Sequence, residues 1–139
     1  MAVHFLLDTN ILSEPTKRHP NEQVMQQLMK NSGQFAIASV SYHEVIFGYL
    51  RLPKSRKRRE IEAYMQQSVE GVLEILSYDN TAARWHALER TRLMQAGTTP
   101  PYVDGQIAAI AATNNLTLVT RNTDDFEAFQ DLQIANWFE

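Results

Sequence analysis

The opening of this chain limits its possible folds more than any other stretch. Residues 3–7 form a mostly apolar run without polar alternation, which is typical of a strand buried on both faces of a parallel sheet. The run ends at Asp8, Thr9 and Asn10. These residues suit a helix cap, and they also suit a site at the carboxyl edge of the sheet, where open α/β sheets bind ligands. The stretch therefore predicts an α/β domain and leaves both interpretations of Asp8 open.

Further strands and helices alternate along the rest of the chain. Short apolar strands are expected at 35–38, 72–76 and 116–119, and 132–135 fits a short fifth strand. Helices are expected at 21–30 (with Met25 and Met29 in the core), at 39–50, from 55 onward, at 79–95 and from 101 onward. This alternation predicts one α/β domain over residues 1–139, with a central, mostly parallel sheet of four or five strands flanked by helices.

The composition limits where the protein is expected to be located and which metal ligands it can offer. The 139 residues are 44% hydrophobic and 21% charged, which is ordinary for a folded soluble domain. No apolar run approaches membrane-spanning length and the amino terminus lacks the features of a signal peptide, so we expect a cytoplasmic protein without a membrane segment. The absence of cysteine excludes disulfides and thiolate metal sites. Any metal must therefore be held by oxygen or imidazole.

Positive charge is concentrated in one segment although the net charge is -3. Six of the 13 basic residues fall in this basic segment, namely Arg51, Lys54, Arg56, Lys57, Arg58 and Arg59. Such a run is usually a solvated turn, but it can also follow a phosphate backbone. The segment is therefore a candidate RNA-binding surface.

Acidic residues recur after the predicted strands. They are Asp8 after the first strand, Glu44 and Asp104 early in two helices, and Asp124 and Asp125 after the fourth strand. Connections that leave parallel strands at one edge would gather these carboxylates in one cleft. Like charges share such a space only if a cation or a shared proton neutralises them. Carboxylate oxygens suit Mg²⁺ or Mn²⁺, which can activate water against a phosphodiester.

Each acid also has an ordinary structural explanation. Asp104 can serve only the dipole of its helix, and Glu44 can be an exposed helix residue. Two phosphoryl-transfer folds fit poorly, because a haloacid-dehalogenase-like phosphatase needs a second Asp where this chain has Asn10, and a receiver domain needs a strand-end Lys. The remaining alternative is a non-catalytic module that binds a partner or nucleic acid.

Four segments carry a resemblance to a known family. They are LLDTN at 6–10, SVSYHEVIFG at 39–48, PYVDGQIA at 101–108 and VTRNTDDF at 119–126. These segments resemble the four motif blocks of the PIN-domain ribonucleases, and within that superfamily the VapC/FitB toxins of bacterial type II toxin–antitoxin systems. The resemblance implies a PIN-like three-layer fold and a metal-dependent endoribonuclease that hydrolyses RNA phosphodiester bonds.

The same resemblance assigns residues and partners. Asp8, Glu44 and Asp104 match the metal-binding acids, with Thr9 and Asn10 beside the first. Asn122 stands where the family often has an acid, so Asp125 or Asp124 would supply the fourth contact. Thr120, Asn122 and Asp124 complete the supporting polar set. The implied cofactor is Mg²⁺ or Mn²⁺, and the implied partners are RNA, a cognate antitoxin and a second copy in a homodimer.

Two expectations concern the helix at 39–50. Its apolar face around Val40, Phe47 and Leu50, together with Ile61, offers a groove for an amphipathic antitoxin helix. His43 is expected to point away from Glu44, because adjacent helical residues lie about 100° apart. We therefore interpret His43 as structural.

Overall fold

The computed structural model describes residues 2–139 and has a five-stranded parallel sheet at its centre. The strands are β1 (Phe5–Leu7), β2 (Phe35–Ala38), β3 (Ile75–Leu76), β4 (Thr117–Val119) and β5 (Ile134–Ala135). Their order across the sheet is β3-β2-β1-β4-β5. The predicted parallel α/β architecture is confirmed, although β3 is shorter than the strand expected at 72–76.

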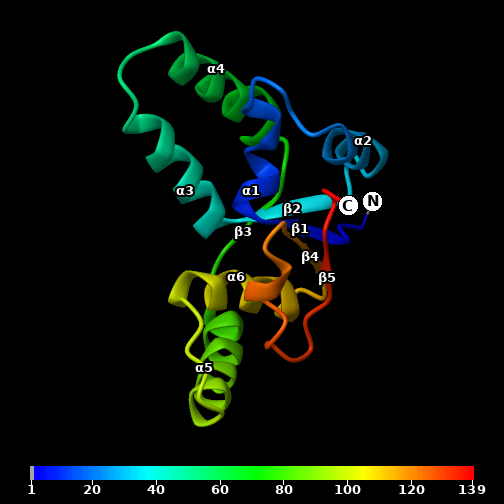
Figure 1. Cartoon of the computed structure of the whole chain (residues 1–139), viewed down its shortest axis with the longest axis vertical. Helices are drawn as coiled ribbons and strands as arrows, with labels where there is room; N and C mark the ends of the chain where they lie inside the picture. The colour runs from blue at the N-terminus through cyan, green and yellow to red at the C-terminus, as the bar shows by residue number, and fades with distance from the viewer. Residues whose placement is uncertain (1) are drawn as a thin grey trace.

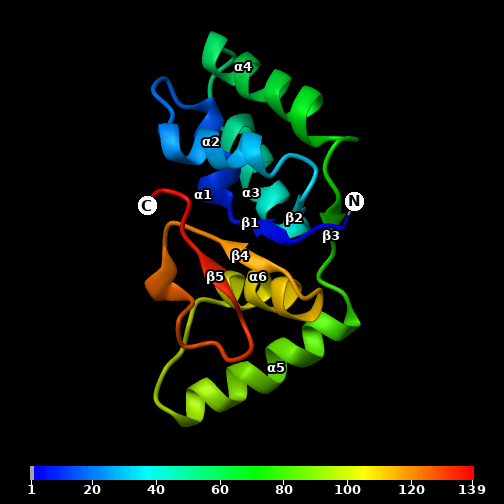
Figure 2. The same cartoon turned by 90° about the vertical axis from the view of Figure 1, so that its right-hand side faces the viewer.

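Helices cover both faces of this sheet (Figures 1 and 2). One face carries α1 (Thr9–Leu12), α2 (Glu22–Lys30), α3 (Ser39–Leu50) and α4 (Arg56–Tyr64), together with the short helical turns η1 (Glu14–Thr16) and η2 (Met65–Val69). The other face carries α5 (Asn80–Gln95) and α6 (Tyr102–Thr113). The turn η3 (Thr123–Asp125) follows β4. Within residues 2–139, no helix combines the length and apolar character needed to cross a membrane.

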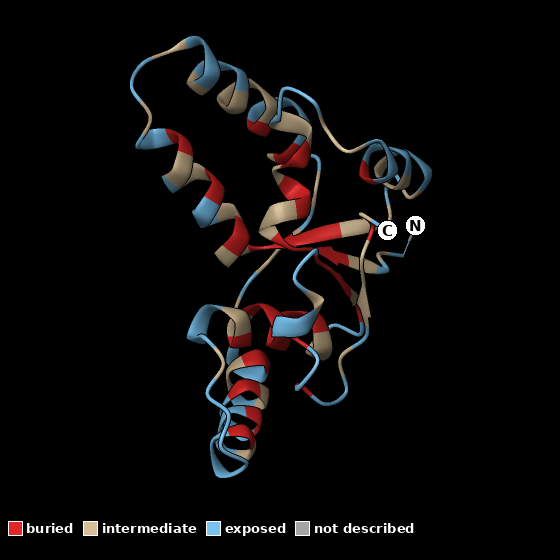
Figure 3. Ribbon diagram, viewed as in Figure 1, coloured by how far each residue is buried: buried red, intermediate tan, exposed pale blue. Residues whose placement is uncertain are grey.

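Successive residues of the strands point to opposite faces of the sheet and pack into two hydrophobic cores, one on each side. Leu6 packs with the small buried residues of α6, whereas Leu7 packs with Ile11 of α1 and Val45 of α3. Figure 3 shows the buried residues gathered at the sheet and on the inward faces of the helices. Because both faces are buried, the strands read as continuous apolar runs, as the sequence indicated.

Polar caps and one glycine define several helix ends. The side chains of Asn21 and Asp79 accept hydrogen bonds from the backbone N–H groups of Val24 at 3.0 Å and Ala82 at 2.9 Å. Gly97, at φ +86°, follows α5 in the left-handed conformation that favours glycine.

The two methionines of α2 do not lie where the sequence analysis placed them. Met25 and Met29 are both exposed, and Met29 is 81% exposed. The prediction that they belong to the core is wrong, because Val24 is the residue of α2 that is fully buried and the methionines lie on other faces of the helix.

Helices α5 and α6 approach closely at Gly105. A Cβ atom at this position would overlap the imidazole of His86, so a side chain cannot fit unless that ring moves. The same imidazole shares a hydrogen bond of 2.8 Å with the Tyr78 hydroxyl through Nδ1. This packing fixes the first turn of α6, which carries Asp104.

Candidate functional site

The predicted site residues meet at the carboxyl edge of β1 and β4. The chain runs from β1 to one side of the sheet through β2 and to the other side through β4, so the strand order changes direction between β1 and β4. Such a switch point is where open α/β sheets leave a crevice for ligands. The Thr120 hydroxyl, just after β4, donates a hydrogen bond of 2.8 Å to Asp8 Oδ2, just after β1.

Asp8 serves as a helix cap and as the centre of this edge. Its Oδ1 accepts a hydrogen bond of 2.8 Å from the backbone N–H of Thr9, and Asn10 Nδ2 lies 3.4 Å from Oδ2. Only 7% of the residue is exposed. Burial raises the pKa of Asp8 against the opposing effect of the Thr120 and Thr9 hydrogen bonds, and the charge of Asp125 raises it further. The two interpretations of Asp8 are therefore compatible.

The pKa of Asp104 is raised by the charges of three other acids. Burial raises the pKa of Asp104 to about 6, with further contributions from the charges of Asp125, Asp8 and Glu44. These acids come from η3, the end of β1 and α3, so four separate connections place their carboxylates within electrostatic reach of one another. We call Asp8, Glu44, Asp104 and Asp125 the acid cluster.

The structure distinguishes between the two acids that follow β4. Asp125 is the one whose charge raises the pKa of both Asp8 and Asp104. Asp124, its neighbour in η3, is not among the charges that raise either pKa, although both residues are exposed. The backbone N–H of Asn122 donates to Thr120 Oγ1 at 3.1 Å, so this residue supports the threonine that holds Asp8. Of the two, Asp125 is therefore the acid that lies within electrostatic reach of Asp8 and Asp104, and its role as the fourth acid stays a prediction.

The acid cluster offers oxygen donors but not a closed cage. Within the part of the chain that the structure describes, no three Asp, Glu or His side chains lie close enough to hold a metal ion directly. The charge of Asp125 nevertheless raises the pKa of Asp8, and the charges of Asp125, Asp8 and Glu44 raise the pKa of Asp104, so these carboxylates lie within electrostatic reach of one another. This separation suits Mg²⁺, which keeps several water molecules and uses few direct carboxylate ligands.

A cavity of about 520 Å³ adjoins the acid cluster, between α3, α6 and the segment before α5. Its lining residues are Ser39, Val40, His43, Glu44, Tyr78, Val103 and Gln106. His43 and Glu44 both line this cavity, and the His43 ring stacks on Phe47 one turn further along α3. That His43 points away from Glu44 stays a prediction. Sequence reasoning missed Tyr78 and Gln106, which come from elements whose contact with α3 depends on the fold.

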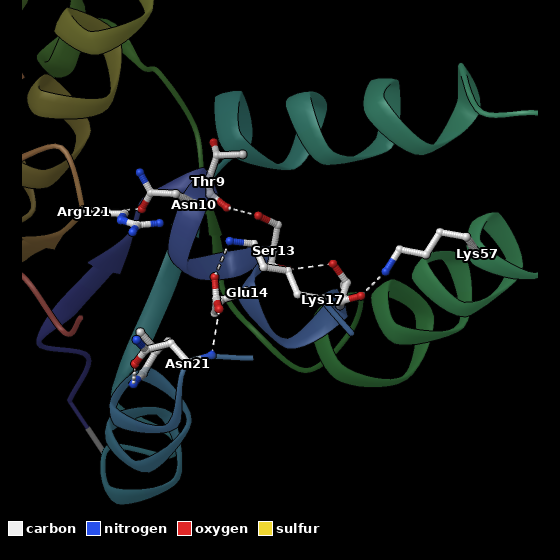
Figure 4. Close-up of polar contacts among 10 residues, drawn as sticks. Thr9, Asn10, Ser13, Glu14, Lys17, Asn21, Lys57 and Arg121 are labelled. Atoms are coloured by element: carbon white, nitrogen blue, oxygen red, sulfur yellow. Dashed lines mark hydrogen bonds and ion pairs between the residues drawn. The ribbon is translucent and has the colours of Figure 1, made fainter. Parts of the chain in front are cut away.

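The basic segment does not join the acid cluster. It lies around the turn between α3 and α4, at the opposite end of α3 from Glu44 (Figure 1). Several of its side chains have partners within the protein, because Arg56 Nε lies 3.1 Å from Glu60 Oε1 and Arg58 Nη1 donates to the Leu52 carbonyl at 3.3 Å. Lys57 donates to the carbonyl of Thr16 (Figure 4). Binding of RNA by this segment remains a prediction.

An apolar groove is present on α3, with a lining that differs from the predicted one. It has a volume of about 350 Å³ and is lined by Tyr42, His43, Ile46, Phe47 and Leu50. Phe47 and Leu50 are half exposed, as the prediction required. Val40 and Ile61 were wrongly included, because they pack against the cores on opposite sides of the sheet.

A family model for the PIN domain matches residues 5–132. The chain belongs to the PIN-domain family. The three-layer arrangement predicted from the resemblance is therefore confirmed, and the acid cluster lies at the switch point of a PIN-domain sheet.

Curated relatives of this PIN domain include a toxin and an endonuclease. The chain is 30% identical over 134 residues to the tRNA(fMet)-specific endonuclease VapC of Salmonella typhimurium, covering 96% of this chain and 97% of the relative. It is 31% identical over 134 residues to the toxin FitB of Neisseria gonorrhoeae, covering 94% and 96%. The VapC/FitB resemblance is confirmed.

Solved structures show the same architecture. FitAcB from Neisseria gonorrhoeae matches this PIN domain with a TM-score of 0.89 at 30% identity, covering 97% of this chain and 99% of that chain. DNA-bound VapBC from Salmonella typhimurium matches with a TM-score of 0.84 at 30% identity, covering 97% and 98%. Both matches extend over nearly the whole chain.

Proposed function

We propose that this protein is a metal-dependent endoribonuclease and the toxin of a toxin–antitoxin pair. Asp8, Glu44, Asp104 and Asp125 would hold Mg²⁺ or Mn²⁺, partly through water. The observation that carries the proposal is the position of Asp8 at the switch point of a PIN-domain sheet, held by Thr120 and within electrostatic reach of Asp104 and Asp125. Such a cation, when bound, activates water and stabilises an in-line displacement at a phosphodiester.

The protein's own groups would orient the acids for this chemistry. The Thr120 hydroxyl and the Thr9 backbone N–H hold the two oxygens of Asp8, and Asn122 in turn supports Thr120. Such outer contacts orient metal ligands and tune their basicity. Asp104 has a pKa of about 6, so it is predominantly ionised at neutral pH and available to a cation.

We further propose that an antitoxin controls this site. The named relatives support the proposal, since FitB of Neisseria gonorrhoeae is called a toxin and VapBC-5 from Mycobacterium tuberculosis is called a member of the VapBC family of toxin–antitoxin systems. The apolar groove that Phe47 and Leu50 line can take an amphipathic helix. An Arg or Lys of the partner could neutralise the acid cluster. A homodimer remains a prediction.

A cleavage assay tests the nuclease proposal. The purified protein, incubated with a panel of structured RNAs, should cut in the presence of Mg²⁺ or Mn²⁺ and not in the presence of a chelator. The variants Asp8→Asn, Glu44→Gln and Asp104→Asn should remain folded and lose cleavage. Cleavage by Asp8→Asn at the native rate would overturn the assignment of the acid cluster.

One observation favours the non-catalytic alternative. Among the described residues, no three of the acids lie close enough together to hold a metal ion directly. Acids that only stabilise the fold would not need to form such a group. A binding module would bind RNA or its partner equally well with and without a divalent metal, and it would cut no RNA under either condition. Expression without a partner also separates the two, since only the nuclease should arrest growth, and the Asp8→Asn variant should not.

A further inference from the structure

The cavity beside the acid cluster has the composition of a site for a flat organic group. Val40 and Val103 supply apolar surface, while the Gln106 amide and the Ser39 hydroxyl supply polar atoms. Its volume of about 520 Å³ lies within the range of small-molecule sites. The lining contains Glu44 and no Lys or Arg. A phosphate or an acidic peptide is therefore a poor occupant, and a neutral group that forms hydrogen bonds is a good one.

The cavity is continuous with the acid cluster. Glu44 belongs to both, and Val103 and Gln106 lie on the same turns of α6 as Asp104. In RNA, each phosphate is joined through ribose to a base. A phosphate positioned at the acids would therefore carry a neighbouring base within reach of this cavity.

The imidazole ring of His43 lines the cavity and is held by a neighbouring ring. Its ring is nearly parallel to that of Phe47, with an interplanar angle of 6° and centroids 5.9 Å apart. The Arg51 guanidinium lies 4.6 Å from the Phe47 centroid, so the three side chains form a ladder along α3. A ring that neighbours already hold loses little freedom when a base stacks on it, and base–aromatic stacking is a general source of RNA affinity.

Tyr78, which also lines the cavity, is held in place as well. The Tyr78 hydroxyl shares its hydrogen bond of 2.8 Å with His86 Nδ1. The His86 ring in turn packs against Gly105 so closely that no Cβ would fit there. The Tyr78 ring is thus fixed relative to the first turns of α6, and the cavity keeps its width.

We propose that this cavity binds the base of a nucleotide next to the cleaved bond, with His43 stacking on the base and the Gln106 amide recognising its edge. A glutamine amide offers two donors and an acceptor, which is what recognition of a base edge requires. The proposal rests on the nuclease function and names the specificity subsite of that enzyme. His43 and Gln106 would decide which sequences are cut, while the acids decide whether cutting occurs.

A binding measurement tests the subsite without any cleavage. The full-length protein, with Mg²⁺, is titrated with the four ribonucleoside 5′-monophosphates and with ribose 5-phosphate, which lacks the base. Nuclear magnetic resonance follows the side-chain amide of Gln106 and the ring protons of His43. At least one nucleotide should bind about tenfold more tightly than ribose 5-phosphate, which corresponds to one base stack, and should shift both sets of signals.

Matched variants locate the effect. Gln106→Leu keeps the size of the side chain and removes its hydrogen bonds, with Gln66→Leu on the exposed side of η2 as control. His43→Ala is compared with His4→Ala, which is exposed near the opposite edge of the sheet. The Gln106 and His43 variants should reduce nucleotide affinity toward that of ribose 5-phosphate, and the controls should bind like the native protein.

Cleavage of a random-sequence RNA library provides the second measurement. The native protein should show a base preference at one position beside the cut, and Gln106→Leu should cut without that preference. Equal binding of nucleotides and ribose 5-phosphate, or an unchanged preference in Gln106→Leu, would overturn the subsite even if the protein is a nuclease. Conversely, base-dependent binding at Gln106 by a protein that cuts no RNA would support the subsite and remove the nuclease function.

Discussion

Two buried carboxylates near the start of the chain have opposite electrostatic surroundings. Asp8 is 7% exposed and has a raised pKa, because burial and the charge of Asp125 outweigh its hydrogen bonds. Glu14 is 2% exposed and has a lowered pKa. For Glu14 the cost of burial, which raises the pKa, is exceeded by the hydrogen bonds from Lys17 and the backbone N–H of Asn21 and by the charges of Lys17 and Arg121.

The contacts of Glu14 explain its role (Figure 4). Lys17 Nζ lies 2.8 Å from Glu14 Oε1, and the Asn21 backbone N–H donates to Oε2 at 2.8 Å. These bonds tie the loop after η1 to the start of α2. The protein therefore neutralises Glu14 with its own cation, whereas it surrounds Asp8 and Asp104 with further acids. That difference is what we expect if Glu14 stabilises the fold and the acid cluster binds a cation from outside, as proposed above.

The largest expected effect is a difference in the rate of RNA cleavage between variants of Asp8 and Glu14. Asp8→Asn should lower the rate of RNA cleavage by at least about a hundredfold, the upper end for residues that only support a metal ligand. Glu14→Gln should leave the rate per folded molecule unchanged, because Glu14 lies outside the acid cluster. Rates measured on one RNA, with the folded fraction determined by circular dichroism, provide the test. Equal reductions in the two variants would break the comparison.

The next largest expected effect concerns the contribution of Glu14 to the free energy of unfolding. Glu14→Ala should lower the free energy of unfolding by about 2 kcal/mol, since the Asn21 N–H and the Lys17 ammonium would no longer have their acceptor. The matched control is Glu22→Ala on the exposed first turn of α2, with a change within about 0.5 kcal/mol. Urea unfolding of the metal-free proteins measures both. A neutral Glu14→Ala would show that this carboxylate is not structural.

A smaller effect concerns pH. The folded protein holds the Asp104 proton more tightly than the unfolded chain, since its pKa is about 6 instead of 3.8. The free energy of unfolding without metal should therefore fall as the pH rises from about 4 to about 6, by about 1 kcal/mol once solvent screening of this partly exposed group is allowed for. In Asp104→Asn this fall should be smaller, because only the contribution of Asp8, whose pKa is also raised, would remain. Identical pH profiles of the free energy of unfolding for the two proteins would show that the pKa of Asp104 is not raised in the folded state.

The smallest effect tests whether the basic segment supplies the positive charge that RNA needs near the acids. Changing Arg56, Lys57, Arg58 and Arg59 together to Ala should flatten the salt dependence of RNA binding. The slope should change by up to roughly 0.7 log units per decade of salt for each phosphate that these side chains neutralise. Three of them already have protein partners, so few phosphates should be involved. Metal binding should be unaffected, and an unchanged slope would exclude the segment from RNA binding.

Local patterns were enough for the sheet and for most of the acids. An apolar run that ends in Asp8 and the helix starts near Glu44 and Asp104 are short-range signals, and the parallel topology brings them to one edge. Glu14 was missed because its acceptor role depends on a backbone N–H and on Arg121, which lies far along the chain. The shared cavity of His43 and Glu44 was missed for a similar reason, since the other residues that line it come from elements far along the chain.

Metal binding tests most directly whether the acid cluster needs an external cation. Thermal unfolding is followed during titration with Mn²⁺ for the native protein, Asp8→Asn, Asp104→Asn and Glu14→Gln. The native protein and Glu14→Gln should be stabilised, by about 2.7 kcal/mol when the metal reaches about a hundred times its Kd, whereas the two Asp variants should be stabilised little. If Mn²⁺ did not stabilise the native protein, or stabilised Asp104→Asn as much as the native protein, the account of the acid cluster would be contradicted.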